Sequence, residues 1–558
     1  MRTIQPDYPA CQADFGHRRV TENNNSSIIS ANLKITEVVG ISQKGRSSMT
    51  QQQKPKQPNI LFIMADQMAA PVLSIYGGKT ARTPNLDAMA ERGVVFESAY
   101  CNSPLCAPSR YVLMSGQLPS KIGAWDNAAE FPADIPTFAH YLRHAGYRTA
   151  LSGKMHFCGP DQLHGFEERL TTDIYPADYG WFPDWEDFEN RPTWYHNMSS
   201  VTQAGPTVRT NQLDFDDEVV FHAQRYLLDH VRSSDERPFC LTVSMTHPHD
   251  PYAIPQEYWD RYSDDEIELP SFEISAEEQD PHSRRLLHVY QMDRNNVSDQ
   301  QIKNARRAYY GAISYVDDQI GKLLKALEDS GLADDTIVVF SGDHGDMLGE
   351  RGLWYKMSYF EWSTRVPMVV CAPKHFEPHR VAESVSTMDL LPTFAELAHG
   401  GTAPEYVMPI DGRSLMPHLT GGQGHDEVIG EYMGEGVIAP MFMIRRGDYK
   451  YICSQPDPDQ LFNLKQDPQE RNNLAEDPGH AELLASLREE AAQRWDSDAI
   501  TREVIISQKR RRMIAAAHKQ GIEPKWDHQP IFDASRMYMR NNIDLDDLEK
   551  RARFPQVD

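Results

Sequence analysis

The chain has 558 residues and a formal net charge of −25, with 40% hydrophobic and 25% charged residues. One hydrophobic core rarely supports a chain of this length, so we expect a large domain and a smaller one. The acidic balance argues against nucleic acid and acidic membrane surfaces as partners. No run of about 18 apolar residues is present, which predicts that no helix spans a membrane.

The seven cysteines form no Cys-x-x-Cys pair and have no regular spacing. The N-terminus lacks the basic-then-apolar pattern of a secretory signal, and with so few cysteines this predicts a reducing, cytoplasmic compartment. Residues 1–57 are polar and low in complexity. We expect them to be either a disordered extension or the product of an upstream start codon that is not the natural one.

The first expected element of the fold is a strand at residues 59–64, a short apolar run typical of a strand buried on both faces. Asp66 and Gln67 follow at its carboxyl end, where open α/β sheets collect their ligands. Residues 106–110 then read Cys-Ala-Pro-Ser-Arg. Because proline fits the first helical turn, this segment predicts a helix whose N-terminus favours an anion near Cys106.

Helices and buried strands alternate over the next part of the chain, which predicts a doubly wound α/β domain over residues 58–400. The expected elements are a helix and a strand within 135–166, a helix at 216–232, a strand at 239–245, a helix from 313 that ends at Gly331, and strands at 336–340 and 366–371. An aromatic-rich segment at about 171–215 is irregular, and such long segments in compact domains are usually functional or mobile.

Beyond residue 400 the pattern changes to short strand-like runs between 427 and 464 and a helix at about 480–495. This change predicts a small C-terminal domain over residues 401–498. Residues 499–558 are polar and rich in arginine, and we expect them to form an extended tail.

Residues 106–116 resemble the signature Cys-x-Pro-Ser-Arg-x-x-Leu-x-(Thr/Ser)-Gly of the type I sulfatases. In that family a maturation enzyme oxidises the cysteine to formylglycine, and a hydroxyl of the hydrated aldehyde attacks sulfur. The resemblance implies that Cys106 is the precursor of the nucleophile. It also implies an alkaline-phosphatase-like mixed sheet with helices on both faces and a smaller α+β domain with an antiparallel sheet. The alternative is an ordinary buried cysteine before a helix.

A divalent metal is expected where two strand ends meet, because carboxylates and a carbonyl-type oxygen suit a hard cation. Together with Cys106, the expected ligands are Asp66, Gln67, Asp343 and His344. Type I sulfatases usually carry Asp-Asp at the first pair and Asp-Asn at the last, so Gln67 and His344 depart from the family pattern. The metal therefore stays open, with calcium first and magnesium or manganese behind it.

Three cationic side chains complete the expected sulfate site. Lys154 and Lys356 supply positive charge to the non-bridging oxygens of a sulfate ester. Arg110 lies one helical turn after Cys106, from where it can orient the nucleophile. Each lysine taken alone would more often be a solvated surface charge.

Two histidines are expected to divide the proton transfers. By resemblance, His249 in the Pro-His-x-Pro element is the general acid that protonates the leaving alkoxide. His156 in the Gly-Lys-x-His element is the base that removes the second diol proton, which releases sulfate. His247 competes with His249 for the first role, and we prefer His249 because it holds the family's position.

Several longer stretches resemble the bacterial choline-sulfatase family, which hydrolyses choline-O-sulfate to choline and sulfate. They are residues 103–110, 116–120, 125–130, 159–169, 246–251 and 538–546. A quaternary ammonium group needs aromatic faces and carboxylates because it donates no ordinary hydrogen bond. The irregular aromatic segment offers Trp181 and His196, and the resemblance adds Asn127, Glu435 and, from the tail, Asp546.

The same resemblance implies a homo-oligomer, either a dimer or a tetramer, whose tail helps the subunits to assemble and closes over a site. It also implies a formylglycine-generating maturation enzyme as a partner. One alternative is another hydrolase of the superfamily that acts on alkyl or aryl sulfates, phosphonates or phosphate esters. A second alternative, from a different functional class, is a non-catalytic choline-binding scaffold protein.

Overall fold

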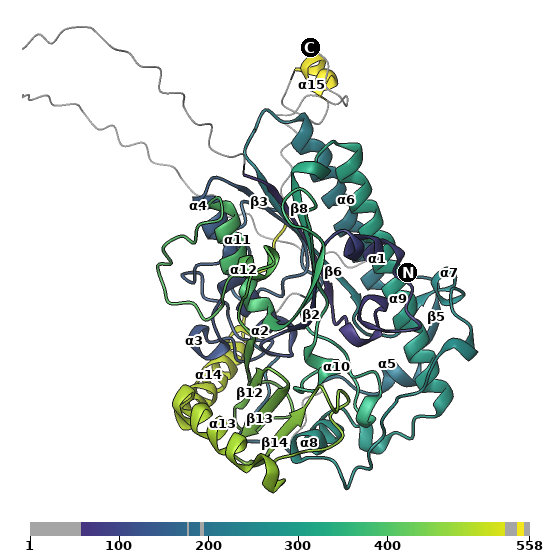
Figure 1. Ribbon diagram of the computed structural model, residues 1–558, viewed down its shortest axis with the longest axis vertical. Coiled ribbons are helices and arrows are strands. Elements are labelled where there is room, and N and C mark those ends of the chain that lie inside the picture. The colour runs from purple at the N-terminus through teal and green to yellow at the C-terminus, as the bar shows by residue number, and fades with distance from the viewer. Residues whose placement is uncertain (1–56, 176–177, 190–194, 531–543, 552–558) are drawn as a thin grey trace, which may run out of the picture. The chain divides into compact units, whose positions relative to one another are not determined.

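The central sheet is arranged around strand β1 (Asn59–Asp66), whose eight residues are all buried (Figure 1). The computed structural model describes residues 57–175, 178–189, 195–530 and 544–551. Seven more strands join β1: β2 (Val94–Tyr100), β3 (Arg148–Gly153), β4 (Glu168–Arg169), β6 (Phe239–Pro248), β8 (Thr336–Gly342), β9 (Met368–Cys371) and β10 (His379–Ser386).

The eight strands lie in the order β10-β2-β9-β8-β1-β6-β3-β4. The run from β8 to β4 is parallel throughout, so these strands present their carboxyl ends at one edge. Strand β9 runs antiparallel to both of its neighbours, β2 and β8. The sheet is therefore mixed, and its parallel half carries the positions expected to form the site.

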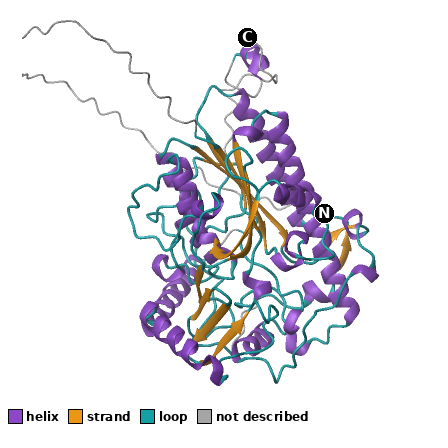
Figure 2. Ribbon diagram, in the orientation of Figure 1, coloured by secondary structure: helices purple, strands orange, loops and turns teal. Residues whose placement is uncertain are grey.

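Helices cover both faces of the sheet (Figure 2). One face packs against α1 (Pro84–Glu91), α6 (Asn211–Arg232) and α9 (Asp299–Asp329), and the other against α2 (Cys106–Ser115), α4 (Phe138–His144) and α11 (Leu390–Ala398). The side chains of β1 alternate between these two cores. Leu61 and Ile63 join the first core, whereas Phe62 packs edge-on against Phe138 and Phe394 in the second.

A second, four-stranded sheet is antiparallel, as expected for the small C-terminal domain. Its strands are β11 (Glu427–Tyr432), β12 (Met441–Arg446), β13 (Tyr449–Ser454) and β14 (Asp457–Asn463). Helix α13 (Ala481–Arg494) packs on it through Leu484 and Leu487. The alkaline-phosphatase-like fold class with its added antiparallel sheet is thus confirmed.

Two helices differ from the sequence-based expectation. Helix α9 begins at Asp299 rather than near residue 313, because Ser298 and Gln301 form a capping box ahead of the apolar stripe. Residues 497–518, expected to be part of an extended tail, form the 22-residue helix α14 (Ser497–His518). The buried residues of this helix are Val504, Ser507, Gln508 and Arg511, so the apolar periodicity that predicts a helix is weak.

The remaining elements are short. They are α3 (Pro119–Ile122), α5 (Ser199–Thr202), β5 (Gly205–Thr207), β7 (Ala253–Pro255), α7 (Gln256–Trp259), α8 (Pro281–Val289), α10 (Glu361–Thr364), α12 (Met416–Leu419) and α15 (Leu545–Arg551). The described residues, from 57 onward, belong to one compact unit. The boundaries expected near residues 400 and 498 stay predictions.

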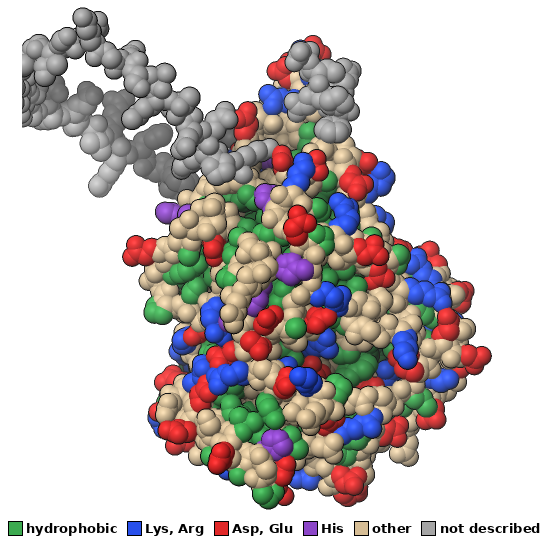
Figure 3. Space-filling view, in the orientation of Figure 1, with side chains coloured by type: hydrophobic (Ala, Val, Ile, Leu, Met, Phe, Trp, Pro, Cys, Tyr) green, Lys and Arg blue, Asp and Glu red, His purple; other side chains and the backbone are tan. Residues whose placement is uncertain are grey.

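Parts of the sequence-based expectations lie outside the described residues, namely the N-terminal extension up to residue 56 and the stretch at 538–543. Among the helices that are described, none combines the length and the apolar character needed to cross a bilayer. On the face drawn in Figure 3, acidic and basic side chains are interspersed rather than gathered into one patch.

Candidate active site

Cys106 is the first residue of α2, a helix whose ten residues are all buried. Its Sγ atom lies 3.2 Å from Nε2 of His344 and 3.9 Å from Oδ1 of Asp66. The preceding residue, Leu105, is extended and caps the helix without a side-chain hydrogen bond. The thiol therefore stands at a helix N-terminus, as the sequence predicts.

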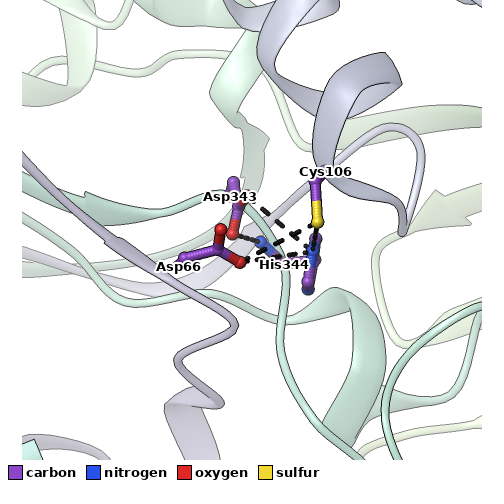
Figure 4. A group of neighbouring side chains, drawn as sticks. All are labelled: Asp66, Cys106, Asp343 and His344. Atoms are coloured by element: carbon purple, nitrogen blue, oxygen red, sulfur yellow. Dashed lines mark hydrogen bonds and ion pairs between the residues drawn. The ribbon is translucent and has the colours of Figure 1, made fainter. Parts of the chain in front are cut away.

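Four of the predicted ligands converge on one point (Figure 4). Asp66 ends β1, and Asp343 directly follows β8, whose Gly342 is paired in parallel register with Ala65. The ligand atoms of Asp66, Cys106, Asp343 and His344 all lie within 4.8 Å of one another. The carboxyl ends of β1 and β8 therefore meet beside Cys106, as expected.

The donor set of this group suits a divalent cation. Nδ1 of His344 bonds to the carbonyl oxygen of Gly345 at 3.0 Å, which leaves the Nε2 lone pair facing inward. That Nε2 atom lies 3.7 Å from Oδ1 of Asp66 and 3.7 Å from Oδ2 of Asp343. Two buried carboxylates and an imidazole lone pair that face each other in this way need a positive charge among them.

Gln67 lies beside this group, but its side chain turns elsewhere. Its backbone has a φ of 64°, and its amide Nε2 donates to Oδ2 of Asp346 at 2.6 Å. The amide oxygen accepts a hydrogen bond from Nζ of Lys356 at 2.7 Å, while the backbone N–H donates to Asp343 at 3.0 Å. The role of the Gln67 side chain as a metal ligand stays a prediction.

Arg110 is fully buried and bridges the two carboxylates of the group. Its Nε donates to Oδ2 of Asp343 at 2.9 Å, and its Nη2 donates to Oδ2 of Asp66 at 3.3 Å. The remaining nitrogen donates to the carbonyl oxygen of Lys154 at 2.5 Å and to Oγ of Ser244 at 2.8 Å. The guanidinium thus fixes the ligand geometry through a set of charge-assisted hydrogen bonds.

The two predicted lysines enter the site from different segments and are both buried. Lys154 follows β3, forms an ion pair with Asp66, and lies 4.5 Å from the ring centroid of Tyr175. Gly153 permits this approach, since its φ is +113° and an added Cβ would collide with the carbonyl oxygen of Ser244. Lys356 reaches the site from the loop after β8.

These cations control the ionisation of the Cys106 thiol. Burial raises the pKa of the Cys106 thiol, but Lys154, Lys356 and His344 more than offset this effect and hold it well below its usual value. Burial likewise raises the pKa of the Asp66 carboxyl, whereas Lys154, His249 and Arg110 lower it, so that it falls to about 2. The site is built to hold negative charge at the tip of α2.

His249 faces the site, whereas His247 does not. Nε2 of His249 lies 3.0 Å from Nζ of Lys356, and its Nδ1 is 2.7 Å from the carbonyl oxygen of Asp250. Nδ1 of His247 instead contacts Oδ2 of Asp216 on α6 at 2.7 Å. This arrangement supports the preference for His249 as the candidate acid.

His156 is almost fully buried, and neither of its ring nitrogens has a hydrogen-bond partner among the described residues. Its backbone N–H donates to Oδ2 of Asp173 at 3.0 Å, which holds the residue at a φ of 59°. The ring also contributes to the lowered pKa of the Cys106 thiol. A buried imidazole with both nitrogens unpartnered suits proton transfer to a ligand.

The residues predicted to hold a cationic group surround this centre. The Trp181 ring meets the His156 ring edge-on, with centroids 6.1 Å apart. His196 stacks on Tyr355 at 4.6 Å. Asn127 accepts a hydrogen bond at 3.0 Å from the backbone N–H of Ala107, the residue after Cys106.

Glu435 follows β11 in the second sheet and is buried. Its Oε2 atom has no hydrogen-bond partner among the described residues. Burial, with a smaller contribution from Asp126, raises the pKa of this carboxyl to about 7 although Lys356 lowers it. An unpaired buried carboxyl of this kind suits a cationic ligand.

Asp546 is not brought to the site within this chain. It belongs to α15, which contacts α6, and Arg551 of the same helix donates to the carbonyl oxygen of Ser233 at 3.1 Å. Ser233 follows α6 and precedes β6, so it lies at the amino end of the parallel strands, away from the ligand group. Asp546 therefore lies away from the ligand group of its own chain, and its part in substrate binding stays a prediction.

Sequence reasoning missed the carboxylates that orient the reacting groups. Asp346 accepts from Gln67, from the Tyr252 hydroxyl at 2.8 Å and from two backbone N–H groups. Asp173 holds the backbone of His156, and Asp250 lies 3.3 Å from Nδ1 of His249. Each of these carboxylates lies within or beside a motif recognised in the sequence, and this proximity is the signal that could have identified it.

Comparison with protein families matches residues 58–401 to the sulfatase family. Residues 349–496 match the family described as N-sulphoglucosamine sulphohydrolase, C-terminal. Residues 502–554 match the family described as choline sulfatase enzyme C terminal.

Two relatives among known proteins illustrate the similarity. The choline-sulfatase of Rhizobium meliloti is 47% identical over 508 residues, which cover 89% of this chain and 99% of the relative. An arylsulfatase of Clostridium perfringens is 28% identical over 452 residues, which cover 77% of this chain and 93% of the relative.

Solved structures share the fold at lower identity. The phosphonate monoester hydrolase of Agrobacterium radiobacter superposes with a TM-score of 0.62 at 23% identity, covering 78% of this chain and 95% of that one. The phosphonate monoester hydrolase of Silicibacter pomeroyi gives a TM-score of 0.63 at 24% identity, covering 78% of this chain and 95% of that one.

Proposed function

The chain belongs to the sulfatase family, and from this premise we propose that it hydrolyses choline-O-sulfate to choline and sulfate. The observation that carries the choice of ester is its likeness to the choline-sulfatase of Rhizobium meliloti, of which it covers 99%. The C-terminal match at residues 502–554 supports the same choice, because it lies outside the part matched by the general family.

We place the nucleophile at Cys106. A formylglycine made from this residue by a maturation enzyme supplies, once hydrated, a hydroxyl group for attack on sulfur and an aldehyde that can form again as sulfate leaves. The burial of α2 and the helix N-terminus keep this position dry and favourable to negative charge. Arg110 supports it by holding Asp66 and Asp343 in place.

The ester's sulfate head group is bound between the two lysines. Nζ of Lys356 lies 2.7 Å from Gln67 and 3.0 Å from His249, so it stands where a non-bridging oxygen can replace one of these contacts. Lys154 approaches from the other side, beside Asp66. In a buried site these charges stabilise the negative charge that grows on the sulfate oxygens.

A divalent ion held by Asp66, Cys106, Asp343 and His344 would act as a Lewis acid toward the sulfate group, with calcium as first choice and magnesium or manganese as alternatives. The donor chemistry of the four residues supports this assignment, and Gln67 is a further candidate ligand.

The two histidines carry the protons. His249 donates a proton from Nε2 to the leaving choline oxygen, while Asp250 holds the Nδ1 side of the ring. His156 removes a proton from the hydrated nucleophile position when sulfate is released, and its unpartnered nitrogens suit that role.

The choline head group is bound by aromatic faces and carboxylates. Trp181 and His196 lie beside the two catalytic histidines, and the unpaired oxygen of Glu435 supplies negative charge. Asn127 completes this pocket next to the nucleophile loop. Because Asp546 lies away from this chain's own site, we propose that the protein forms a homo-oligomer, a dimer or a tetramer, in which the tail of a neighbour closes the pocket.

The test is sulfate release from choline-O-sulfate by the matured enzyme, compared with 4-nitrophenyl sulfate and a phosphonate monoester. We expect the highest kcat/KM for choline-O-sulfate. A higher kcat/KM for the phosphonate would assign the chain to the other ester class, and no turnover of any ester by protein that carries formylglycine would favour a non-catalytic scaffold.

A further inference from the structure

Helix α14 has a mostly polar inner face that packs onto the loops of the candidate active site. Ser507, Gln508 and Arg511 are buried beyond the apolar Val504, although polar side chains on the buried side of a helix are unusual. Burying an arginine costs free energy unless its charge is paired. The partner of Arg511 therefore shows which part of the structure the helix positions.

The partner of Arg511 is Asp126, which is 385 residues away in the sequence and fully buried. The pairing is bidentate, with Nη1 donating to Oδ1 at 2.6 Å and Nη2 donating to Oδ2 at 2.8 Å. Oδ1 also accepts from the backbone N–H of Ala128 at 2.9 Å, so the carboxylate fixes the turn that contains Asn127. Asn127 in turn contacts the start of α2.

The same guanidinium supports a second wall of the pocket. Its central carbon lies 5.2 Å from the ring centroid of Phe182, the residue after Trp181. One turn earlier, Oε1 of Gln508 accepts a hydrogen bond at 3.1 Å from the backbone N–H of Trp185. Arg511 therefore stands between the loop that carries Asn127 and the loop that carries Trp181.

We propose that Arg511 is a positioning residue that sets the distance between Asn127 and Trp181 and thereby the fit of the cationic part of the substrate. The inference rests on the proposed function, because it concerns the pocket for the choline head group. It assigns to α14 a role within its own chain, separate from any role of the tail in assembly. Arg511 acts through Asp126 and Phe182 and does not touch the reacting atoms.

The decisive variant is Arg511→Lys, which keeps the charge but loses the planar fork that matches Asp126. We expect KM for choline-O-sulfate to rise by about five- to twenty-fold, with kcat and the constants for 4-nitrophenyl sulfate changed less than about two-fold. Inhibition of 4-nitrophenyl sulfate hydrolysis by choline should weaken by the same factor, whereas inhibition by inorganic sulfate should not change.

The matched control is Arg510→Lys on the same helix, because Arg510 is exposed at the surface. Its kinetic constants should equal those of the parent enzyme. Asp126→Asn tests the pair from the other side and should reproduce the selective rise in KM. Thermal unfolding of each variant establishes that it is folded before the kinetics are compared.

An equal loss on both esters in Arg511→Lys, or no change on either, would overturn the positioning role. The two proposals fail in different ways. A parent enzyme that shows no preference for choline-O-sulfate and no inhibition by choline contradicts the proposed substrate. A parent enzyme that shows both, with a variant that keeps them, contradicts only the role of Arg511.

Discussion

At the scale of single residues, the positive charges of the site have different partners. Arg110 directs its hydrogen bonds to two carboxylates, a carbonyl and a hydroxyl, so it has little capacity left for substrate. Lys356 bonds to the Gln67 amide oxygen and to Nε2 of His249, and no carboxylate among the described residues forms an ion pair with it. The lysine is therefore the better candidate for direct contact with the sulfate group, and the arginine for holding the ligands.

Cys106→Ala should abolish turnover and leave the fold intact, because one small buried side chain replaces another. Its thermal unfolding midpoint should stay within a few degrees of the parent, as a loss of about 1 kcal/mol implies. The matched control is Cys240→Ala, since Cys240 is an equally buried thiol in the amino-terminal half of β6. Turnover by Cys106→Ala near the parent level would refute the nucleophile assignment.

Trp181→Ala should weaken the use of choline-O-sulfate more than the use of an uncharged alkyl sulfate. Cation–π contacts contribute about 0.5–2 kcal/mol, which corresponds to a fall of roughly two- to thirty-fold in kcat/KM for the cationic ester alone. Steady-state kinetics on both esters measure the difference. Equal losses would mean that the ring serves packing against His156 rather than binding a cation.

Glu435 makes folding stability depend on pH. Its folded-state pKa of about 7 lies above the value of 4.5 for a free glutamate, so the carboxyl is more easily ionised in the unfolded chain. Stability therefore falls as pH rises from 4.5 through 7, by about 3 kcal/mol at 1.4 kcal/mol per unit. Glu435→Gln should gain stability relative to the parent at about pH 8 and not at about pH 4.5, as urea unfolding at both values would measure.

At the scale of elements, the end of β6 depends on α6. Asp216 on α6 accepts three hydrogen bonds there, from the backbone N–H of Thr246 at 2.6 Å, from that of His247 at 2.9 Å and from the His247 ring at 2.7 Å. This end of the strand carries His249 into the site. A helix that contributes no reacting group thus positions the candidate acid.

Asp216→Ala leaves three buried donors unpaired and should cost about 3 kcal/mol or more in the free energy of unfolding. It should also lower kcat, since the segment before His249 loses its anchor. Chemical denaturation measures the first effect. Asp214→Ala is the control on the same helix, because Asp214 is exposed, and it should change the stability by less than about 0.5 kcal/mol.

Strands β1, β6 and β8 were predictable because each is a short apolar run followed by polar residues of the candidate site. The meeting of Asp66 with Asp343 follows from the parallel pairing of β1 and β8. Helix α14 was not predictable, because its buried side is mostly polar and its Arg511 pairs with Asp126, far away in the sequence. Hydrophobic periodicity depends on the local sequence and gives no information about a distant partner.

The side chain of Gln67 shows what motif reasoning leaves out. Its place after Asp66 predicts a ligand, and the motif gives no sign of the hydrogen bonds that the side chain makes to Asp346 and Lys356. These bonds depend on a φ of 64° at Gln67 and on a carboxylate from the loop after β8. Spacing along the chain identifies which residues meet, and the orientation of their side chains requires three dimensions.

At the scale of the whole molecule, the candidate site joins both sheets. The ligand group stands on the large sheet, whereas Glu435 follows the first strand of the small one. Strand β11 approaches the large domain through the backbone N–H of Glu431, which donates to the carbonyl oxygen of Asn102 at 2.9 Å. The small sheet therefore completes the site as well as extending the core.

Removal of the metal should destabilise the whole protein as well as stop turnover. Without a cation, the buried acceptor atoms of Asp66, Asp343 and His344 face one another. The charges of Arg110 and Lys154 are then left to offset the negative charge of the two carboxylates. Chelator treatment should lower the unfolding temperature, and re-addition at about 100 times Kd should restore about 2.7 kcal/mol. Elemental analysis and back-titration with Ca²⁺, Mg²⁺ and Mn²⁺ identify the ion. An unfolding temperature that does not change with any of the three ions would contradict a metal site at these residues.

The burial of α2 limits when Cys106 can meet a second protein. Cys106 is 2% exposed, and the helix that begins with it is enclosed along its whole length. If a maturation enzyme converts this residue to formylglycine as proposed, it would have to reach the thiol before the sheet closes around it. Protein that folds before that encounter would then keep its thiol.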